Sequence, residues 1–115
     1  MVKENILKIK ERISYICSKI NQDPDSITIV SVAKARTSEQ IKEAIDAGIT
    51  DIAENKVQEA ILKYNALRTI DYAQRIKWHM VGHLQTNKVK EAVKNFALIQ
   101  SVDSVHLAQE IDKQA

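Results

Sequence analysis

The stretch ITIVSVAKART, from Ile27 to Thr37, contains one complete transition from strand to helix. Residues 27–33 are apolar or small at every position, which is typical of a strand covered on both faces in a parallel sheet. The run then ends abruptly in Lys34. Thr37, with Gln40 three residues later, resembles a capping box and predicts that a helix begins here. The stretch therefore predicts a strand, a loop that carries a lysine, and a helix.

Three further units of the same kind follow along the chain. We expect strands at residues 49–53, 76–81 and 97–101, each followed by apolar residues at helical spacing. Before the first strand, an amphipathic helix is predicted by isoleucines at positions 6, 9, 13, 16 and 20. Alternating strands and helices predict parallel strands with right-handed crossovers, and hence an α/β fold.

Two α/β architectures accommodate one helix followed by four strand-helix units. One is a small open sheet of four strands, and the other is half of a (β/α)8 barrel, which usually needs about 250 residues. The length of 115 residues favours the open sheet, and we expect residues 1–115 to form a single domain. The final helix carries no glycine stop signal, which indicates a chain that once continued.

The composition limits the class of protein. Hydrophobic residues make up 44% and charged residues 28% of the chain, the balance of a soluble globular protein. No apolar run could span a bilayer, and charged residues among the first twenty exclude a secretory signal, so we expect a cytoplasmic location. A net charge of +2 without a basic stripe argues against nucleic-acid binding. Cys17, the single cysteine, is interpreted as a packing residue.

Polar side chains follow each predicted strand at its carboxyl end. In parallel α/β folds these ends form one face, and ligands bind there. The sequence therefore predicts that the following residues converge on one site: Lys34 and Arg36 after the first strand, Glu54 and Asn55 after the second, His83, Gln85 and Asn87 after the third, and Ser101 and Asp103 after the fourth.

Lys34 is the strongest single candidate among these residues. It alternates with Thr28, Val30 and Val32, so we expect its stem to emerge along a packed face with its amine partly desolvated. Such an amine has a lowered pKa and can attack an aldehyde to form a Schiff base. The alternative is a lysine whose ammonium extends into solvent at a strand end, and spacing alone favours this alternative.

The segment HMVGH, from His79 to His83, has the histidine spacing of a helical zinc motif. It lacks the glutamate after the first histidine, and both Gly82 and the β-like run before it argue against a helix. On a strand, the two histidines would lie about 13 Å apart, too far to bind one metal ion together. We therefore expect no metal site.

Four segments together resemble one protein family. They are IVSVAKART, IAENKVQEA, WHMVGHLQTNKVK and LIQSVDSVHLAQEI, which occur in this order over nearly the whole chain. They are similar to the successive signatures of the pyridoxal phosphate homeostasis proteins, a group related to the N-terminal barrel of alanine racemase. That family has a (β/α)8 TIM-type barrel with an extra N-terminal helix. The resemblance implies an N-terminal helix plus four βα units, which is half of such a barrel.

The resemblance also implies a cofactor site. The family holds pyridoxal 5′-phosphate as an aldimine on the lysine that ends the first strand, and Lys34 matches that position. Asn55 on the second strand, His79 on the third and Ser101 on the fourth are the further cofactor-binding candidates. Ala53 departs from the glycine that is usual in the family. The family's phosphate-binding loops lie in the second half of the barrel, so we expect weak and reversible retention of the cofactor.

Three functional hypotheses follow from the resemblance. The first is a non-catalytic protein that holds pyridoxal phosphate and buffers its supply. The second, an amino-acid racemase that uses this cofactor, is disfavoured because residues 35–37 lack the tyrosine, glycine and histidine that follow the lysine in alanine racemases. The third is a truncated or split half-barrel that pairs with itself or with a complementary C-terminal half, because an uncovered strand edge and apolar helix faces are unfavourable.

Overall fold

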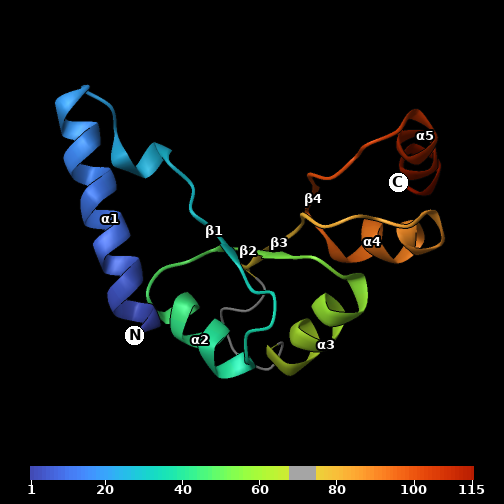
Figure 1. The fold of residues 1–115 in the computed structure, drawn as a ribbon, viewed down its shortest axis with the longest axis horizontal. Helices are drawn as coiled ribbons and strands as arrows, with labels where there is room; N and C mark the ends of the chain where they lie inside the picture. The colour runs from blue at the N-terminus through green and yellow to red at the C-terminus, as the bar shows by residue number, and fades with distance from the viewer. Residues whose placement is uncertain (68–74) are drawn as a thin grey trace.

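The computed structural model describes residues 1–67 and 75–115. Helix α1 (Val2–Lys19) and the short 3-10 helix η1 (Pro24–Ser26) come first, and four strand-helix units follow them (Figure 1). The predicted order of elements is thus confirmed. The strands are β1 (Val30–Val32), β2 (Asp51–Glu54), β3 (Lys77–Met80) and β4 (Leu98–Ile99), and the helices are α2 (Ser38–Asp46), α3 (Val57–Leu67), α4 (Val89–Asn95) and α5 (Val105–Gln114), with the 3-10 helix η3 (Thr86–Lys88) before α4.

The four strands form one parallel sheet in chain order. Val32 pairs with Ala53, Ala53 with His79, and His79 with Leu98, so these four residues make one row across the sheet. The strands are shorter than the sequence predicts. In β1, for example, only residues 30–32 pair with β2. In the sheet that the described residues form, β1 is an edge strand.

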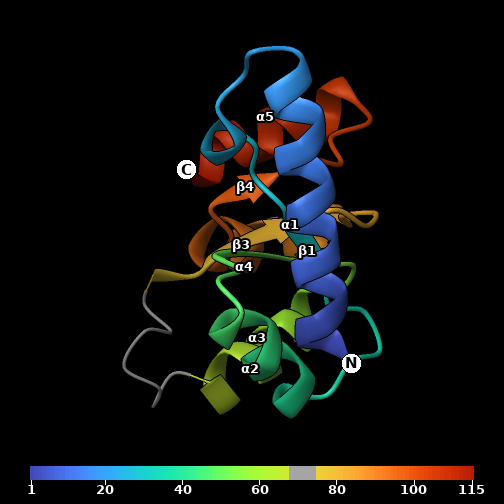
Figure 2. The same ribbon diagram turned by 90° about the vertical axis from the view of Figure 1, so that its left-hand side faces the viewer.

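The hydrophobic core lies between one face of the sheet and the helices behind it. Ile52, Trp78 and Met80 point from the strands into this core and are at most 5% exposed. Figure 1 shows α2 and α3 beneath the sheet, and Figure 2 shows α1 running upright past the β1 edge. The helices contribute apolar residues at helical spacing to the same cluster, among them Ile41, Ala44, Val57, Ala60, Val89 and Ala92.

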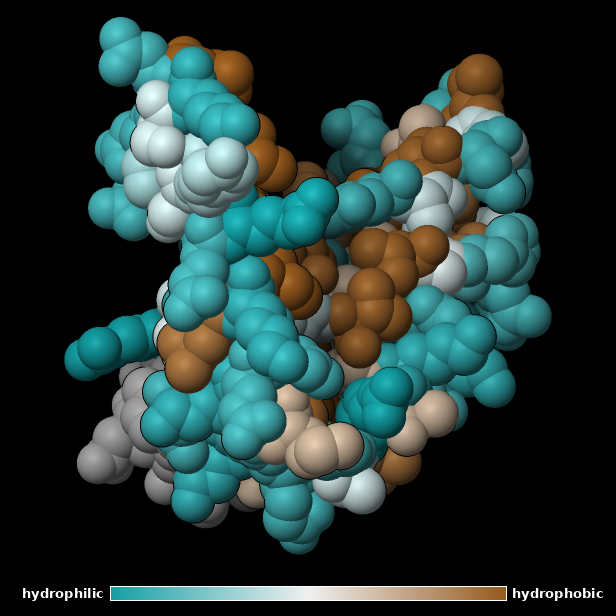
Figure 3. Space-filling model, turned by 60° about the vertical axis from the view of Figure 1, so that its left-hand side comes forward, coloured by the Kyte–Doolittle hydropathy of each residue, from teal (hydrophilic) through white to brown (hydrophobic). Residues whose placement is uncertain are grey.

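The opposite face of the sheet is open in the part of the chain that the structure describes. Val32 of β1 is 57% exposed and Leu98 of β4 is 51% exposed, although both are apolar. Figure 3 shows hydrophobic atoms gathered in a hollow between two upper lobes of the molecule. The prediction of a first strand covered on both faces is therefore wrong here. In a barrel, this second face is covered only when further strands close the ring.

Helix α1 carries the predicted apolar stripe but leaves much of it uncovered. Ile6 and Cys17 are buried, which confirms that the cysteine is a packing residue, whereas Ile9, Ile16 and Ile20 are half exposed or more. Figure 1 shows that α1 contacts the rest of the fold near its N-terminus and then leans away from the sheet. Between α1, β1 and α2 lies a largely apolar groove of 560 Å³.

The ends of the helices follow the sequence signals. Thr37 Oγ1 accepts a hydrogen bond from the Gln40 backbone N–H at 3.2 Å, and Gln40 Oε1 accepts one from the Thr37 N–H at 3.0 Å, which confirms the capping box. Gly48 follows α2 with a φ of 99°, a conformation that glycine adopts without strain. Among the described helices, none is both long and apolar enough to cross a membrane.

Candidate functional site

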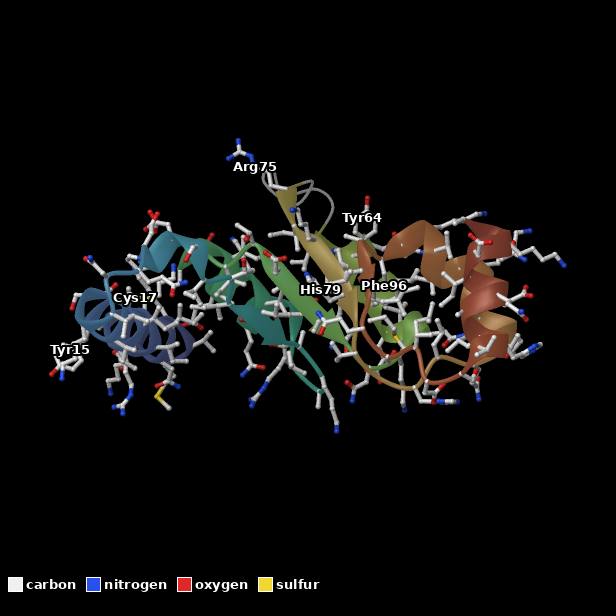
Figure 4. All side chains as sticks on the ribbon, turned by 90° about the horizontal axis from the view of Figure 1, so that it is seen from above. Tyr15, Cys17, Tyr64, Arg75, His79 and Phe96 are labelled. Carbon is white, nitrogen blue, oxygen red and sulfur yellow. The ribbon has the colours of Figure 1, made fainter. Side chains whose placement is uncertain are left out.

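The four candidate cofactor residues lie on successive strands near one edge of the sheet. Lys34 comes two residues after β1, Asn55 directly follows β2, and Ser101 comes two residues after β4, whereas His79 lies within β3. Because the strands are parallel and pair in order, their carboxyl ends meet at the same edge. Figure 4, which views the open face from above, shows His79 near the middle of the sheet.

Lys34 is exposed and sits on a tight turn. The carbonyl oxygen of Ala33 accepts a hydrogen bond from the Arg36 backbone N–H at 3.0 Å, so the chain reverses around residues 34 and 35. Ala35 has a φ of 58°, in the left-handed region that costs an L-residue roughly 1–2 kcal/mol. The expectation of a packed stem is wrong for the described residues, because Val32 on the same side of β1 is itself largely exposed. The turn presents the Lys34 amine to solvent.

His79 belongs to a hydrogen-bonded network that crosses three strands. Its Nε2 lies 2.8 Å from Asp51 Oδ2 of β2, and its Nδ1 lies 2.8 Å from Gln100 Nε2 beside β4. Thr50 Oγ1 donates to the other oxygen of Asp51 at 2.7 Å. Both ring nitrogens are thus engaged within the protein, and the imidazole is 7% exposed. His79 is a fixed structural member of the open face rather than a side chain free to swing toward a ligand.

Asp51 carries the negative charge of this network. Burial raises the pKa of the Asp51 carboxyl, but the hydrogen bonds from Thr50 and His79 and the positive charges of His79 and Lys77 lower it by more. Its pKa in the folded chain therefore lies below the ordinary value of 3.8. The carboxylate contributes stability to the fold wherever it is ionised.

This lowered pKa predicts a specific acid sensitivity. The contribution of Asp51 is fully present above pH 3.8 and is lost as the pH falls through its lower folded-state pKa. We expect the free energy of unfolding, measured by urea denaturation followed by circular dichroism, to fall from pH 5 to pH 2.5 less steeply in Asp51→Asn than in the wild-type chain. Equal slopes for the two proteins would contradict this assignment.

Ser101 and Asn55 show where a polar ligand fits this edge. Ser101 Oγ is buried and has no hydrogen-bond partner among the described residues, which leaves one donor and one acceptor unused. Asn55 lies against Gly82, where an added Cβ would come within 2.4 Å of the Asn55 carbonyl oxygen. Only glycine allows the loops after β2 and β3 to approach so closely. These features fit a small polar group such as the hydroxyl or aldehyde edge of pyridoxal phosphate.

Glu54 does not join the site that the sequence predicts for it. Its side chain is 0% exposed and lies on the helix-facing side of β2, where Glu54 Oε2 pairs with Lys63 Nζ of α3 at 2.5 Å. The same ammonium donates to the carbonyl oxygen of Ala33 at 2.6 Å. Sequence reasoning missed Lys63, because a lysine on the second turn of an amphipathic helix gives no signal of burial.

His83 has a different partner from His79. Its Nδ1 lies 3.5 Å from Asp103 Oδ2, and both side chains are well exposed, so this contact joins two loops at the rim. Arg36 in the loop after β1, Gln85 in the loop after β3 and Asn87 in η3 are all exposed. In residues 1–67 and 75–115, no three His, Cys, Asp or Glu side chains gather as metal ligands would.

Curated proteins similar to this chain include several named pyridoxal phosphate homeostasis protein. The pyridoxal phosphate homeostasis protein of Aquifex aeolicus is 36% identical over 112 residues, which cover 97% of this chain and 47% of that protein. The protein of the same name from Synechocystis sp. is 41% identical over 92 residues, or 80% of this chain and 41% of its own length. No family model matches the chain. The chain therefore spans about half the length of the curated relatives it matches.

Solved structures of similar proteins have the same fold. PipY of Synechococcus elongatus, solved with PLP bound, is 37% identical, with a TM-score of 0.73 over 89% of this chain and 47% of that one. A protein of unknown function from Bifidobacterium adolescentis is 28% identical, with a TM-score of 0.87 over 98% of this chain and 49% of that one. These similarities confirm the half-barrel architecture.

Proposed function

We propose that this chain, which matches the N-terminal half of the pyridoxal phosphate homeostasis proteins over nearly its whole length, binds pyridoxal 5′-phosphate. Lys34 holds the cofactor covalently, and the chain keeps it available without catalysing turnover. One observation carries the proposal: Lys34 stands at the carboxyl end of β1 in a fold whose 37% identical relative PipY was solved with PLP bound.

The attachment step needs only an amine and an aldehyde. The unprotonated nitrogen of Lys34 attacks the aldehyde carbon of the cofactor, a carbon-nitrogen double bond forms as a Schiff base, and one water molecule leaves. No oxidant or reductant takes part. The exposed turn at residues 33–36 supports this role, since it leaves the amine open to a ligand that approaches along the open face.

Three further residues complete the proposed site. Ser101 contributes a buried hydroxyl that has no partner among the described residues, and Asn55 contributes an amide at the neighbouring strand end. His79 contributes a ring whose position is set by Asp51 and Gln100. We assign these side chains to orientation of the cofactor, and Lys34 alone to its capture.

The absence of turnover is part of the proposal. A racemase needs two bases that remove and return a proton on opposite sides of the substrate carbon. Lys34 supplies one amine, but His79, the imidazole on β3, has both ring nitrogens occupied by Asp51 and Gln100. The relatives' shared name, which refers to homeostasis of the cofactor, also supports a storage role.

A titration of the wild-type chain tests the proposed binding. We expect Schiff-base absorbance to rise with added pyridoxal 5′-phosphate and to rise at similar concentrations of 5′-deoxypyridoxal, which lacks both the phosphate and the hydroxyl that would close on the aldehyde as a hemiacetal. The resemblance places the phosphate-binding loops in the other half of the relatives. The phosphate group should therefore contribute little binding free energy to this chain. Pyridoxine 5′-phosphate, which has an alcohol instead of the aldehyde, is the control and gives no band. A chain that gives no band with either aldehyde would refute the proposal.

The open side of the fold supports a second proposal, about a partner. We propose that a polypeptide equivalent to the remaining half of the relatives covers the edge of β1, the edge of β4 and the open face between them. Val32 and Leu98 lie exposed at the two ends of one row across this face, as edge positions that a closed barrel would bury. A second copy of this chain is the alternative partner for the same surface.

A further inference from the structure

A buried ion pair lies behind the sheet, on the side away from the open face. Glu54 of β2 is 0% exposed, and the Lys63 side chain that reaches it from α3 is 13% exposed. The Lys63 Nζ atom lies 2.5 Å from Glu54 Oε2 and 2.6 Å from the carbonyl oxygen of Ala33. One ammonium thus joins the end of β2 to the end of β1.

The carbonyl that Lys63 holds belongs to the residue directly before Lys34. The Ala33 backbone N–H donates to the Ala53 carbonyl oxygen at 2.8 Å, which fixes one side of this residue to β2. On its other side, the Ala33 carbonyl accepts hydrogen bonds from Lys63 and from the Arg36 backbone N–H. Both backbone polar groups of Ala33, the residue that leads into Lys34, are therefore held by hydrogen bonds.

The turn beyond this point needs such support. Ala35 has a φ of 58°, a left-handed conformation that an L-residue adopts at an energetic cost and abandons when its surroundings allow. Charge-assisted hydrogen bonds from an ammonium are stronger than those between neutral groups. Because Glu54 Oε1 has no partner among the described residues, the carboxylate depends on Lys63 for its compensation and holds that ammonium in place.

We propose that Glu54 and Lys63 are positioning residues for Lys34, which set the turn that presents its amine to the cofactor. This inference rests on the proposed function, since it concerns the efficiency of capture at Lys34. The two residues touch neither the cofactor nor the reacting atoms. They act through the Ala33 carbonyl, from the opposite side of the sheet.

The test compares capture at Lys34 with stability in the same variants. Each protein is mixed with one sub-saturating concentration of pyridoxal 5′-phosphate, reduced with borohydride, digested and mapped by mass spectrometry. Glu54→Met with Lys63→Met removes both charges together, which avoids leaving one charge buried and unpaired. We expect this double variant to remain folded by circular dichroism and its labelling at Lys34 to fall at least fivefold. Labelling of Lys42, an exposed lysine on α2, stays unchanged.

A conservative variant separates positioning from general structure. Lys63→Arg keeps a cation with several donors, and we expect its labelling at Lys34 to stay within twofold of wild type even if its melting temperature falls. Should the double variant not fold, Glu54→Gln with Lys63→Gln replaces it, because two neutral amides also leave no charge buried and unpaired; the labelling of this amide pair at Lys34 should fall at least threefold.

The outcomes distinguish this inference from the proposed function. Lys34 labelling equal to wild type in the folded double variant, or in the folded amide pair, overturns the inference and leaves the proposed function standing. Absence of labelling at Lys34 in the wild-type chain overturns the proposed function itself. A loss of labelling in Lys63→Arg as large as in the double variant also overturns the inference. The cation is kept in this variant, so the loss would come from altered packing around Lys63.

Discussion

We expect Lys34→Ala to remove all Schiff-base absorbance from the chain mixed with pyridoxal 5′-phosphate. The amine of Lys34 is the proposed nucleophile, and alanine offers no atom that can replace it. The side chain is exposed, so its loss removes no core packing, and we expect the melting temperature to change little. Absorbance spectra and thermal denaturation on the same samples measure both quantities.

Lys42→Ala is the matched control for this substitution. Lys42 is also an exposed lysine, but it lies on α2 rather than on the turn after β1. Its replacement should leave the absorbance as in the wild-type chain. Equal loss in the two variants, or a full band in Lys34→Ala, would assign the absorbance to scattered surface lysines instead of a site.

Joining this chain to the C-terminal half of one of its relatives should convert weak capture into stable retention. The hybrid covers the open face and, by the family resemblance, adds the phosphate-binding loops. A few charge-assisted hydrogen bonds to the phosphate, each contributing about 1.5–3 kcal/mol, correspond to at least about tenfold tighter binding. We expect the hybrid, but not the chain alone, to keep its cofactor through gel filtration.

Two comparisons make this experiment decisive. The hybrid that carries Lys34→Ala should lose the absorbance band, which ties retention to the same lysine. 5′-Deoxypyridoxal should bind the hybrid at least tenfold more weakly than pyridoxal 5′-phosphate, in contrast to the chain alone. A folded hybrid that retains the cofactor no better than the chain alone would argue that the second half does not complete this site.

The order of elements could be predicted from the sequence because it depends on local patterns. The strand-helix alternation follows from periodicity within each segment, and the capping box at Thr37 and the glycine after α2 mark helix ends through backbone chemistry alone. The choice between an open sheet and half a barrel could not be made this way. It came from the family resemblance, because closure depends on strands that these residues do not include.

The exposure of the first strand shows where local patterns fail. Val30 and Val32 are β-branched residues of the kind found in strands buried on both faces, yet Val32 is 57% exposed. The pattern is that of a strand covered on both faces, as in a closed barrel, while the described residues cover only the helix-facing side. The apolar stripe on α1 shows the same difference between pattern and burial, since Ile9 and Ile16 are about half exposed.

The places of the candidate residues in the fold were predicted in part, and for different reasons at each residue. Lys34, Asn55 and Ser101 were found because they follow strands, and parallel strands bring such positions to one edge. The partners of His79 were missed, because Asp51 and Gln100 meet it only through the register of three strands. The Glu54–Lys63 pair was missed for a similar reason: a contact between a strand end and the second turn of a helix has no sequence signature.

Mapping the site of reduction in the wild-type chain tests the central claim most directly. The chain is mixed with pyridoxal 5′-phosphate, reduced with borohydride, digested and analysed by tandem mass spectrometry. We predict one dominant pyridoxyl adduct, on the peptide that contains Lys34. An adduct spread evenly over the exposed lysines, or no adduct at Lys34, would contradict the claim that this lysine captures the cofactor.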